Sequence, residues 1–344
     1  MLNFIQKLTR LLCDNSKPTP IKNHPVRTHL PSHPSRESFQ IPYLYVVLPY
    51  FNYCQYKTRT KLFLDFIKRI QHKRNLRIIV VEGTPKGVPF DLPTFTSDSV
   101  FLHIKVELPD RVWVKENLIN LAIKNLPKEW YYVAWIDADL TFLNEHWVEE
   151  TIKQLKQVDV VQLFETAMNL GPNAETLKID KGFVYQALTS NQPYTKTYKY
   201  GFWHPGFAWA CNRQAYIKMN GLIDFGILGS GDHHMALALI QKVSSSHPGG
   251  IHLNYQKKLH EYQERCKHFK INYTPGTIIH HFHGSIADRR YQERWNILVR
   301  NQYDPETDII YTKDSILQLS EKGKRLQPPI LEYFIGRNED SKVA

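Results

Sequence analysis

The stretch YYVAWIDADL, residues 131–140, decides the fold, because an apolar run of strand length ends there in two carboxylates separated by one small residue. Around it, apolar runs of strand length alternate with amphipathic stretches of helix length. The other predicted strands are 43–48 (YLYVVL), 77–82 (RIIVVE), 100–108 (VFLHIKVEL) and 158–164 (VDVVQLF). The predicted helices between them are 57–71, 114–126 and 145–157. Such alternation predicts an α/β fold with a mostly parallel sheet flanked by helices.

Composition excludes several classes of protein. The 344 residues are 42% hydrophobic and 12% aromatic, which is enough to bury a core and excludes a disordered chain. No apolar run approaches the roughly 20 residues that cross a bilayer. The four cysteines lie far apart, without the paired spacing of a zinc knuckle or a disulfide framework. The start of the chain lacks the continuous apolar centre of a signal peptide, and we expect a cytoplasmic protein.

The chain divides into three predicted parts. Residues 1–40 combine an amphipathic segment with a proline-rich arm, and the spacing of apolar residues in 1–12 leaves open a peripheral membrane contact. Residues 41–305 form the main domain, whose second half becomes an irregular, aromatic-rich, acceptor-side region. Its further predicted elements are helices near 213–219, 232–243, 254–268 and 288–301, and a strand at 277–283. Residues 306–344 are predicted to be a tail, irregular or frayed from Glu321.

A formal net charge of +11 calls for an anionic partner, which could be nucleic acid, anionic lipid or a small substrate carrying phosphate. The basic residues are scattered, and no recognised nucleic-acid-binding module is present. Charge alone does not choose among these partners.

The two acids of the stretch WIDADL are the first candidate for chemistry. Asp137 and Asp139 follow a buried strand, so two anions lie at its mouth. Carboxylate oxygens suit Mg²⁺ or Mn²⁺, and a pair at a strand end commonly holds such a metal against a diphosphate. The alternative is that both acids begin a turn and cap the following helix.

Two further motifs are candidates. In HHFHGS, residues 280–285, continued strand geometry would place His281 and His283 on one face, where they could join the carboxylates and shift metal preference toward Mn²⁺; structural histidines are the alternative. In GILGSGD, residues 226–232, Asp232 follows a glycine-rich turn. It could cap a helix or deprotonate an acceptor hydroxyl.

In this order, the motifs resemble those of the GT-A nucleotide-sugar glycosyltransferases. The chain is similar to the family-2-like group, to β-1,4-galactosyltransferases and to polypeptide N-acetylgalactosaminyltransferases. The stretches that carry the resemblance are LPYFN (48–52), VVEGT (80–84), WVKENLINLAIKNL (113–126), DAD (137–139), PGFAWACNR (205–213), GSGD (229–232) and HFHG (281–284). The resemblance departs at the turn: where relatives often carry paired acids, Gly231 precedes Asp232.

The resemblance implies metal-dependent transfer of a hexose or N-acetylhexosamine. The donor would be a nucleoside-diphosphate sugar, UDP-sugars foremost, and the acceptor a hydroxyl of a glycan or glycoconjugate. Donor-binding positions would be Pro49, Tyr50, Asn52, Glu82, Lys115, Asn120, Asp137, Gly206 and Trp209. Mn²⁺ or Mg²⁺ would be held by Asp139, Asp137 and either His283 or His281. Asp232 would be the base of an inverting displacement, with a retaining outcome left open. Acceptor-binding candidates are Trp203, His233 and Arg289.

Three other functions compete with this interpretation. A nucleic-acid-binding protein would use the positive charge and show steep salt dependence. A nucleotidyltransferase would need a third acid near the pair and a phosphate-gripping loop, and neither is evident. A non-catalytic GT-A-like scaffold is disfavoured by the joint presence of both aspartates, Asp232 and the histidine cluster. We therefore expect no nucleic-acid partner.

Overall fold

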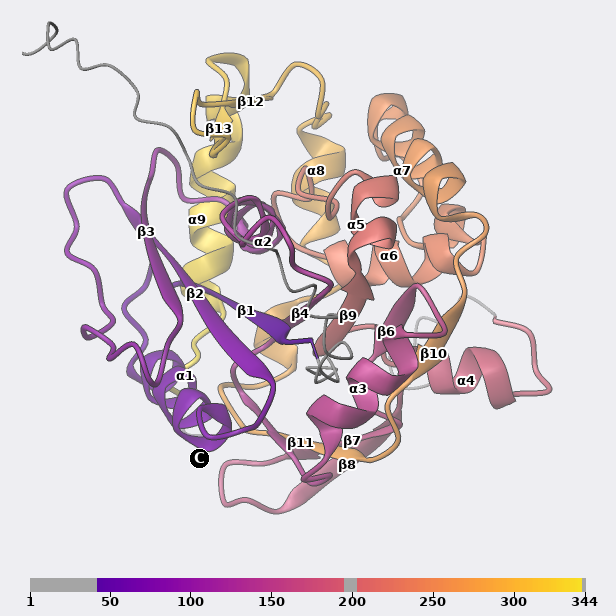
Figure 1. Cartoon of the computed structure of the whole chain (residues 1–344). Coiled ribbons are helices and arrows are strands. Elements are labelled where there is room, and N and C mark those ends of the chain that lie inside the picture. The colour runs from indigo at the N-terminus through magenta and orange to yellow at the C-terminus, as the bar shows by residue number, and fades with distance from the viewer. Residues whose placement is uncertain (1–41, 195–202, 342–344) are drawn as a thin grey trace, which may run out of the picture. The chain divides into compact units, whose positions relative to one another are not determined.

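The computed structural model describes residues 42–194 and 203–341. Seven strands form the central sheet in the order β10-β6-β9-β4-β1-β2-β3 (Figure 1). They are β1 (Leu44–Phe51), β2 (Leu76–Pro85), β3 (Leu102–Leu108), β4 (Tyr132–Ile136), β6 (Val160–Gln162), β9 (Ala208–Asn212) and β10 (Ile271–Tyr273). Strands β1, β2, β3 and β4 run parallel to one another, and β10 runs parallel to β6. Strand β9 runs antiparallel to both of its neighbours, β4 and β6. The predicted fold class, a mostly parallel sheet flanked by helices, is confirmed.

Strand β1 lies where the strand order reverses, with β2 on one side and β4 on the other. In an open α/β sheet, ligands bind beyond the carboxyl ends of the strands at such a point. Here β1 ends at Phe51 and β4 ends at Ile136, directly before Asp137. The fold therefore brings the two aspartates of the DAD motif to the expected binding edge.

A second, four-stranded sheet has the order β5-β11-β7-β8. Its strands are β5 (Leu140–Phe142), β7 (Thr166–Leu170), β8 (Thr176–Lys181) and β11 (Thr277–His280). Strand β5 follows the DAD motif immediately, and β11 pairs with it antiparallel while pairing parallel with β7. This small sheet carries the late histidines to the DAD motif.

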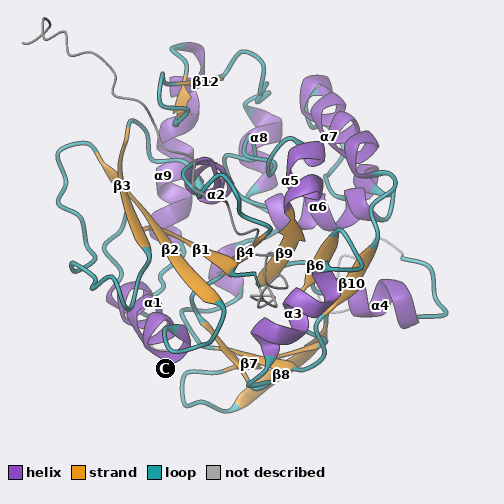
Figure 2. Ribbon diagram, in the orientation of Figure 1, coloured by secondary structure: helices purple, strands orange, loops and turns teal. Residues whose placement is uncertain are grey.

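Helices cover both faces of the central sheet (Figure 2). Side chains of β1 alternate between two cores: Val47 and Phe51 face one, and Val46 and Leu48 face the other. Helices α1 (Lys57–Ile70) and α3 (Trp147–Leu155) pack on the second face. The first face is covered by α2 (Lys115–Lys124), α5 (Arg213–Met219), α6 (Gly231–Leu239), α7 (Leu253–Cys266), α8 (Trp295–Arg300) and α9 (Gln327–Gly336). The remaining short helices are α4 (Phe183–Thr189), η1 (Val243–Ser245), η2 (Ala287–Arg289) and η3 (Lys322–Leu326).

The prediction of an irregular or frayed tail from Glu321 is wrong for most of that segment. Residues from 306 onward form the hairpin β12 (Ile309–Tyr311) and β13 (Leu317–Leu319), then η3 and α9. Ile330 and Phe334 of α9 are buried in the main core, which explains why a short helix without a strong amphipathic pattern is held.

Two other expectations change. The helix predicted at 288–301 is reduced to η2 and α8, because Arg290 adopts a left-handed conformation (φ 42°) that interrupts it. The predicted arm at 1–40, with its membrane contact at 1–12, lies outside the described residues. Among the residues that are described, no helix combines the length and the apolar character that a membrane span requires.

Candidate active site

A cavity of about 490 Å³ lies at the carboxyl ends of β1 and β4. Ten of the predicted site residues line it: Pro49, Tyr50, Lys115, Asp137, Asp139, Gly206, Asp232, His233, His283 and Arg289. These residues come from segments spread over more than 200 positions of the chain, so the sheet topology has assembled them into one site.

Asp139, His280 and His283 form a cluster in which one ligand atom from each side chain lies within 4.8 Å of the others. Oδ2 of Asp139 is 2.7 Å from Nε2 of His283 and 3.7 Å from Nε2 of His280. Oδ1 of Asp139 is buried and has no hydrogen-bond partner in the described parts of the chain. An orphaned carboxylate oxygen beside two imidazoles is a donor set that fits Mn²⁺ or a similar divalent cation.

The position of His280 follows from strand pairing. In β11 it lies opposite Leu140 of β5 and Asn169 of β7, and its Nδ1 is 3.1 Å from Oδ1 of Asn169. An amide oxygen can only accept, so Nδ1 carries the proton and Nε2 offers its lone pair to the cluster. Burial lowers the pKa of His280, with Asp139 opposing, which favours the neutral, ligating form.

The prediction that His281 and His283 share a face, leaving His280 on the other, is wrong. Strand β11 ends at His280, so strand alternation does not continue to His283. His281 points away from the cluster and lies 2.8 Å from the hydroxyl of Thr141. Its backbone N–H donates to the carbonyl of Asp139 and so helps to hold the two motifs together.

Lys115 links the DAD motif to the glycine-rich turn. Its Nζ lies 2.6 Å from Oδ1 of Asp137 and 2.9 Å from Oδ2 of Asp232. Burial disfavours its charge, yet the two carboxylates hold the pKa of Lys115 well above its usual value. Burial raises the pKa of Asp137 to about 6, with Lys115 opposing and Asp232 and Asp139 adding to the rise. One ammonium therefore serves two carboxylates.

Gly231, directly before Asp232, leaves no room for a side chain. A Cβ at this position would lie 2.3 Å from the carboxylate of Glu116, whose Oε2 accepts a hydrogen bond from Nε1 of Trp113. Burial raises the pKa of Glu116 to about 8, with Lys115 opposing. The carboxylate of Glu116, at the start of α2, thus occupies the space that a side chain at position 231 would need.

Several predicted site residues lie elsewhere. The side chain of Asn120 is bonded to the backbone of Leu222 and to the hydroxyl of Tyr216, and does not line the cavity. Trp209 is fully buried in the core, where its indole N–H donates to the carbonyl of Pro205. Both were predicted to face the donor, and both are structural. Trp203 packs on Phe183 and Tyr194 and also lies off the cavity wall.

Asn52 and Glu82 lie in a smaller neighbouring hollow of about 40 Å³. Oε1 of Glu82 accepts from the backbone N–H groups of Asp91 and Leu92, and Oε2 is 3.0 Å from Nε2 of His103. The amide of Asn52 donates to Asp91 and to Tyr50. Asn52 and Glu82, which were predicted to bind the sugar-nucleotide donor, thus hold the loop at residue 91 beside the main cavity.

The cavity has an arginine-rich wall, formed by Arg59, Arg294 and Arg337 beside the predicted Arg289, and sequence reasoning missed Arg59 and Arg337. Glu339 lies among them. Arg294 is 7% exposed, donates to Ser230 and Tyr333, and forms no ion pair with a carboxylate of the described residues. A buried guanidinium without a counter-anion favours an anionic ligand. No local pattern in the sequence marks Arg59 or Arg337 as a site residue.

Comparisons with known proteins bear on the fold. No protein-family model matches the chain, and no curated protein matches it. Solved structures that align with it include a mutant Drosophila β-1,4-galactosyltransferase 7 in complex with manganese, UDP-Gal and xylobiose, at 13% identity and a TM-score of 0.41, over 84% of this chain and 98% of that one.

Two further structures also align. One is a mannosyltransferase from Pyrobaculum calidifontis in complex with GDP-Man and Mn²⁺, at 15% identity and a TM-score of 0.41, over 76% of this chain and 61% of that one. The other is S. aureus TarS in complex with UDP-GlcNAc, at 13% identity and a TM-score of 0.34, over 57% of this chain and 53% of that one. The aligned structures contain nucleotide sugars. At these TM-scores they transfer no residue role to this chain.

Proposed function

We propose that this protein is a metal-dependent glycosyltransferase. It would move a hexose or N-acetylhexosamine from a nucleoside-diphosphate sugar, with UDP-sugars foremost, to a hydroxyl of a glycan or glycoconjugate. The observation that carries the proposal is the partly buried Asp139–His280–His283 cluster, with its orphaned carboxylate oxygen, in the wall of a cavity at the switch point of the sheet.

Asp139, His280 and His283 would hold the divalent cation, Mn²⁺ or Mg²⁺. When bound there, the metal would supply Lewis-acid neutralisation of the charge that develops on a leaving diphosphate. Asp137 is bonded to Lys115 in this structure, which favours a role in holding Lys115 over the metal-ligand role expected from sequence.

The arginine-rich wall supports an anionic donor. Arg289 contacts His283, so it lies beside the cluster, and neither it nor Arg294 is ion-paired with a carboxylate in the described segments. A diphosphate would supply the missing counter-charge, and preorganised guanidinium groups would stabilise it as it leaves.

Asp232 is the proposed general base of an inverting displacement. It lies in the first turn of α6 and lines the cavity. Because Lys115 divides its charge between Asp232 and Asp137, the pair of carboxylates keeps net negative charge that can accept a proton from an acceptor hydroxyl. His233, the next residue on the cavity wall, is the alternative base.

Thermal unfolding with UDP, GDP, CMP and several UDP-sugars, each with and without Mn²⁺, tests the donor class. A ligand that binds only the native state raises its apparent stability, so we expect a shift that needs both a nucleotide and the metal. Asp139→Ala should remove that shift while leaving the metal-free melt cooperative. A cooperative melt without any shift for the unaltered protein would instead favour a non-catalytic or nucleic-acid-binding protein.

Asp232→Asn separates binding from chemistry. If Asp232 is the base, this variant keeps the Mn²⁺-dependent shift with the nucleotide and loses sugar transfer. Near-normal turnover by Asp232→Asn, alongside loss of turnover by His233→Ala, would move the base to His233.

A further inference from the structure

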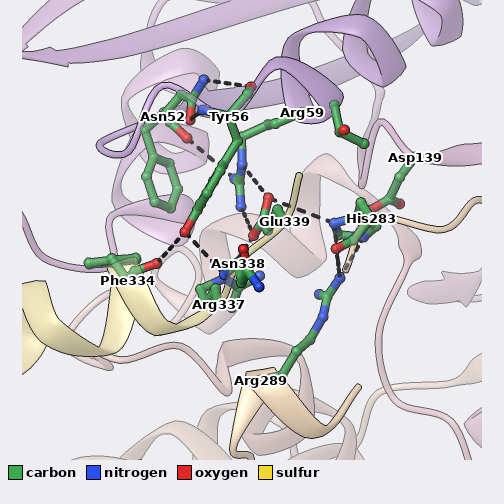
Figure 3. Close-up of polar contacts among 12 residues, drawn as sticks. Asn52, Tyr56, Arg59, Asp139, His283, Arg289, Phe334, Arg337, Asn338 and Glu339 are labelled. Carbon is green, nitrogen blue, oxygen red and sulfur yellow. Dashed lines mark hydrogen bonds and ion pairs between the residues drawn. The ribbon is translucent and has the colours of Figure 1, made fainter. Parts of the chain in front are cut away.

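Residues 337–340, here called the C-terminal strap, lie against the Asp139–His280–His283 cluster although they are distant from it in the sequence (Figure 3). Contacts with the start of α1 and with the residue before it hold the strap in place. The N–H of Asn338 donates to the hydroxyl of Tyr56, and the carboxylate of Asp340 accepts from the first N–H groups of α1, those of Lys57 and Thr58. A carboxylate at a helix N-terminus is a stabilising cap.

Within the strap, Glu339 is buried, with 1% of its surface exposed. Arg59 donates through Nε to Oε2 at 2.9 Å and through Nη2 to Oε1 at 2.5 Å. Arg337 donates through Nε to Oε1 at 2.8 Å. Three hydrogen bonds from two guanidinium groups thus hold the carboxylate of Glu339 in place. The strap therefore presents a fixed carboxylate.

That carboxylate faces the second nitrogen of a cluster histidine. Nε2 of His283 is turned toward Oδ2 of Asp139, at 2.7 Å, and its Nδ1 lies 3.7 Å from Oε2 of Glu339 (Figure 3). His280 shows the same arrangement, with Nε2 toward the cluster and Nδ1 toward the amide oxygen of Asn169. An oxygen thus lies behind each histidine, within hydrogen-bond distance of Nδ1 at 3.1 Å for His280 and just beyond it at 3.7 Å for His283. Such acceptors fix the tautomer and ring orientation of metal-ligating histidines.

Arg289 does not compete for this role. Its Nη2 is 2.9 Å from Nδ1 and 2.8 Å from Nε2 of His283. An atom at such short and nearly equal distances from both ring nitrogens lies over the face of the imidazole ring. It is therefore not aligned with the lone pair of either nitrogen, since these lie in the plane of the ring. The carboxylate oxygen that lies near Nδ1 is Oε2 of Glu339, at 3.7 Å.

We propose that Glu339 is a positioning residue for the metal centre: it holds the proton of His283 on Nδ1, so that Nε2 is presented to the cation. The inference rests on the metal site of the proposed function. It adds that a carboxylate from the end of the described chain, held by Arg59, sets the affinity of that site.

Mn²⁺ affinity of the full-length protein without nucleotide, measured by titration calorimetry, tests the role. We expect Glu339→Gln to weaken Mn²⁺ binding roughly 10- to 100-fold, which is the loss of metal affinity typically caused by replacing a hydrogen-bond acceptor behind a metal-ligating histidine. Asp308→Asn is the matched control, because Asp308 is an equally buried carboxylate held by an arginine, Arg325, and does not line the cavity. It should leave Mn²⁺ affinity unchanged.

A third variant, Asp139→Asn, separates failure of the inference from failure of the proposed function. If Asp139→Asn loses Mn²⁺ while Glu339→Gln binds it as tightly as the unaltered protein, the metal site stands and the positioning role is wrong. If Asp139→Asn also binds normally, the site itself is wrong, and the inference falls with it.

Two measurements keep the test decisive if Glu339→Gln folds poorly. Arg59→Lys leaves Glu339 in place but removes its two-pronged support, so Mn²⁺ binding should weaken in the same direction. Long-range ¹H–¹⁵N spectra of the metal-free protein report which nitrogen of His283 carries the proton. Asp139 draws it to Nε2 and Glu339 draws it to Nδ1, so Arg59→Lys should raise the share of His283 that is protonated on Nε2. A purely structural role for Glu339 would leave that share unchanged, and an unchanged share together with an unchanged Mn²⁺ affinity would overturn the proposal.

Discussion

Replacing Lys115 by methionine tests the charge balance of the site. Nζ of Lys115 contacts Oδ1 of Asp137 at 2.6 Å and Oδ2 of Asp232 at 2.9 Å, so Lys115→Met leaves two carboxylates without their shared cation. Breaking a buried ion pair from one side costs about 3–5 kcal/mol. The side chains of Asp137 and Asp232 are 30% and 20% exposed to solvent. Because water can partly solvate these carboxylates, we expect a loss of stability near the lower end of that range, about 3 kcal/mol. The melting temperature should fall by roughly 5–10 °C.

A double-mutant cycle makes this reasoning refutable. In Asp137→Asn/Lys115→Met, only one carboxylate remains, and the repulsion between the two is gone. We expect this double variant to be more stable than Lys115→Met, although Asp137→Asn alone should be less stable than the unaltered protein. Urea and thermal unfolding of the metal-free variants at neutral pH, followed by circular dichroism, measure the four corners. Simple addition of the two single losses would refute the shared-cation interpretation.

Three other predictions concern the histidine cluster, the C-terminal strap and the remote pair of Asp308 with Arg325. His280→Ala should abolish Mn²⁺ binding and His281→Ala should retain it, as titration calorimetry can show; equal losses would contradict the assignment. A Cβ at Gly284 (φ 88°) would lie 3.0–3.2 Å from the backbone of the C-terminal strap, so Gly284→Ala should weaken Mn²⁺ binding, with an unchanged affinity counting against the strap's role. Although burial opposes it, the hydrogen bonds from Arg325 lower the pKa of Asp308, so its stabilisation exists above the unfolded pKa and disappears as the pH falls through the folded value. Asp308→Asn should cost about 2 kcal/mol at neutral pH and progressively less below about pH 4; a loss independent of pH in urea unfolding would refute this.

The central sheet and one edge of the site could be predicted from sequence because both depend on local pattern. A strand that ends in acids places them at the strand's mouth, so the sequence alone locates Asp139 at the binding edge. The same reasoning failed for Asn120 and Trp209, since the spacing within an element does not say which of its faces the cavity occupies. Glu339 could not be found at all: its partners come from α1 and from the loop after β11, and only tertiary packing brings them together.

The choice between adjacent histidines shows how a core residue outside the site controls its chemistry. Residues two apart in a strand share a face, so His280 lies on the face of Ile278, which is fully buried. A slip of one residue in β11 would expose that isoleucine and would bring His281 to the position opposite Leu140 and Asn169. The burial of Ile278 therefore fixes the register, and the register determines which imidazole meets the acceptor of β7 and turns its Nε2 toward the metal cluster.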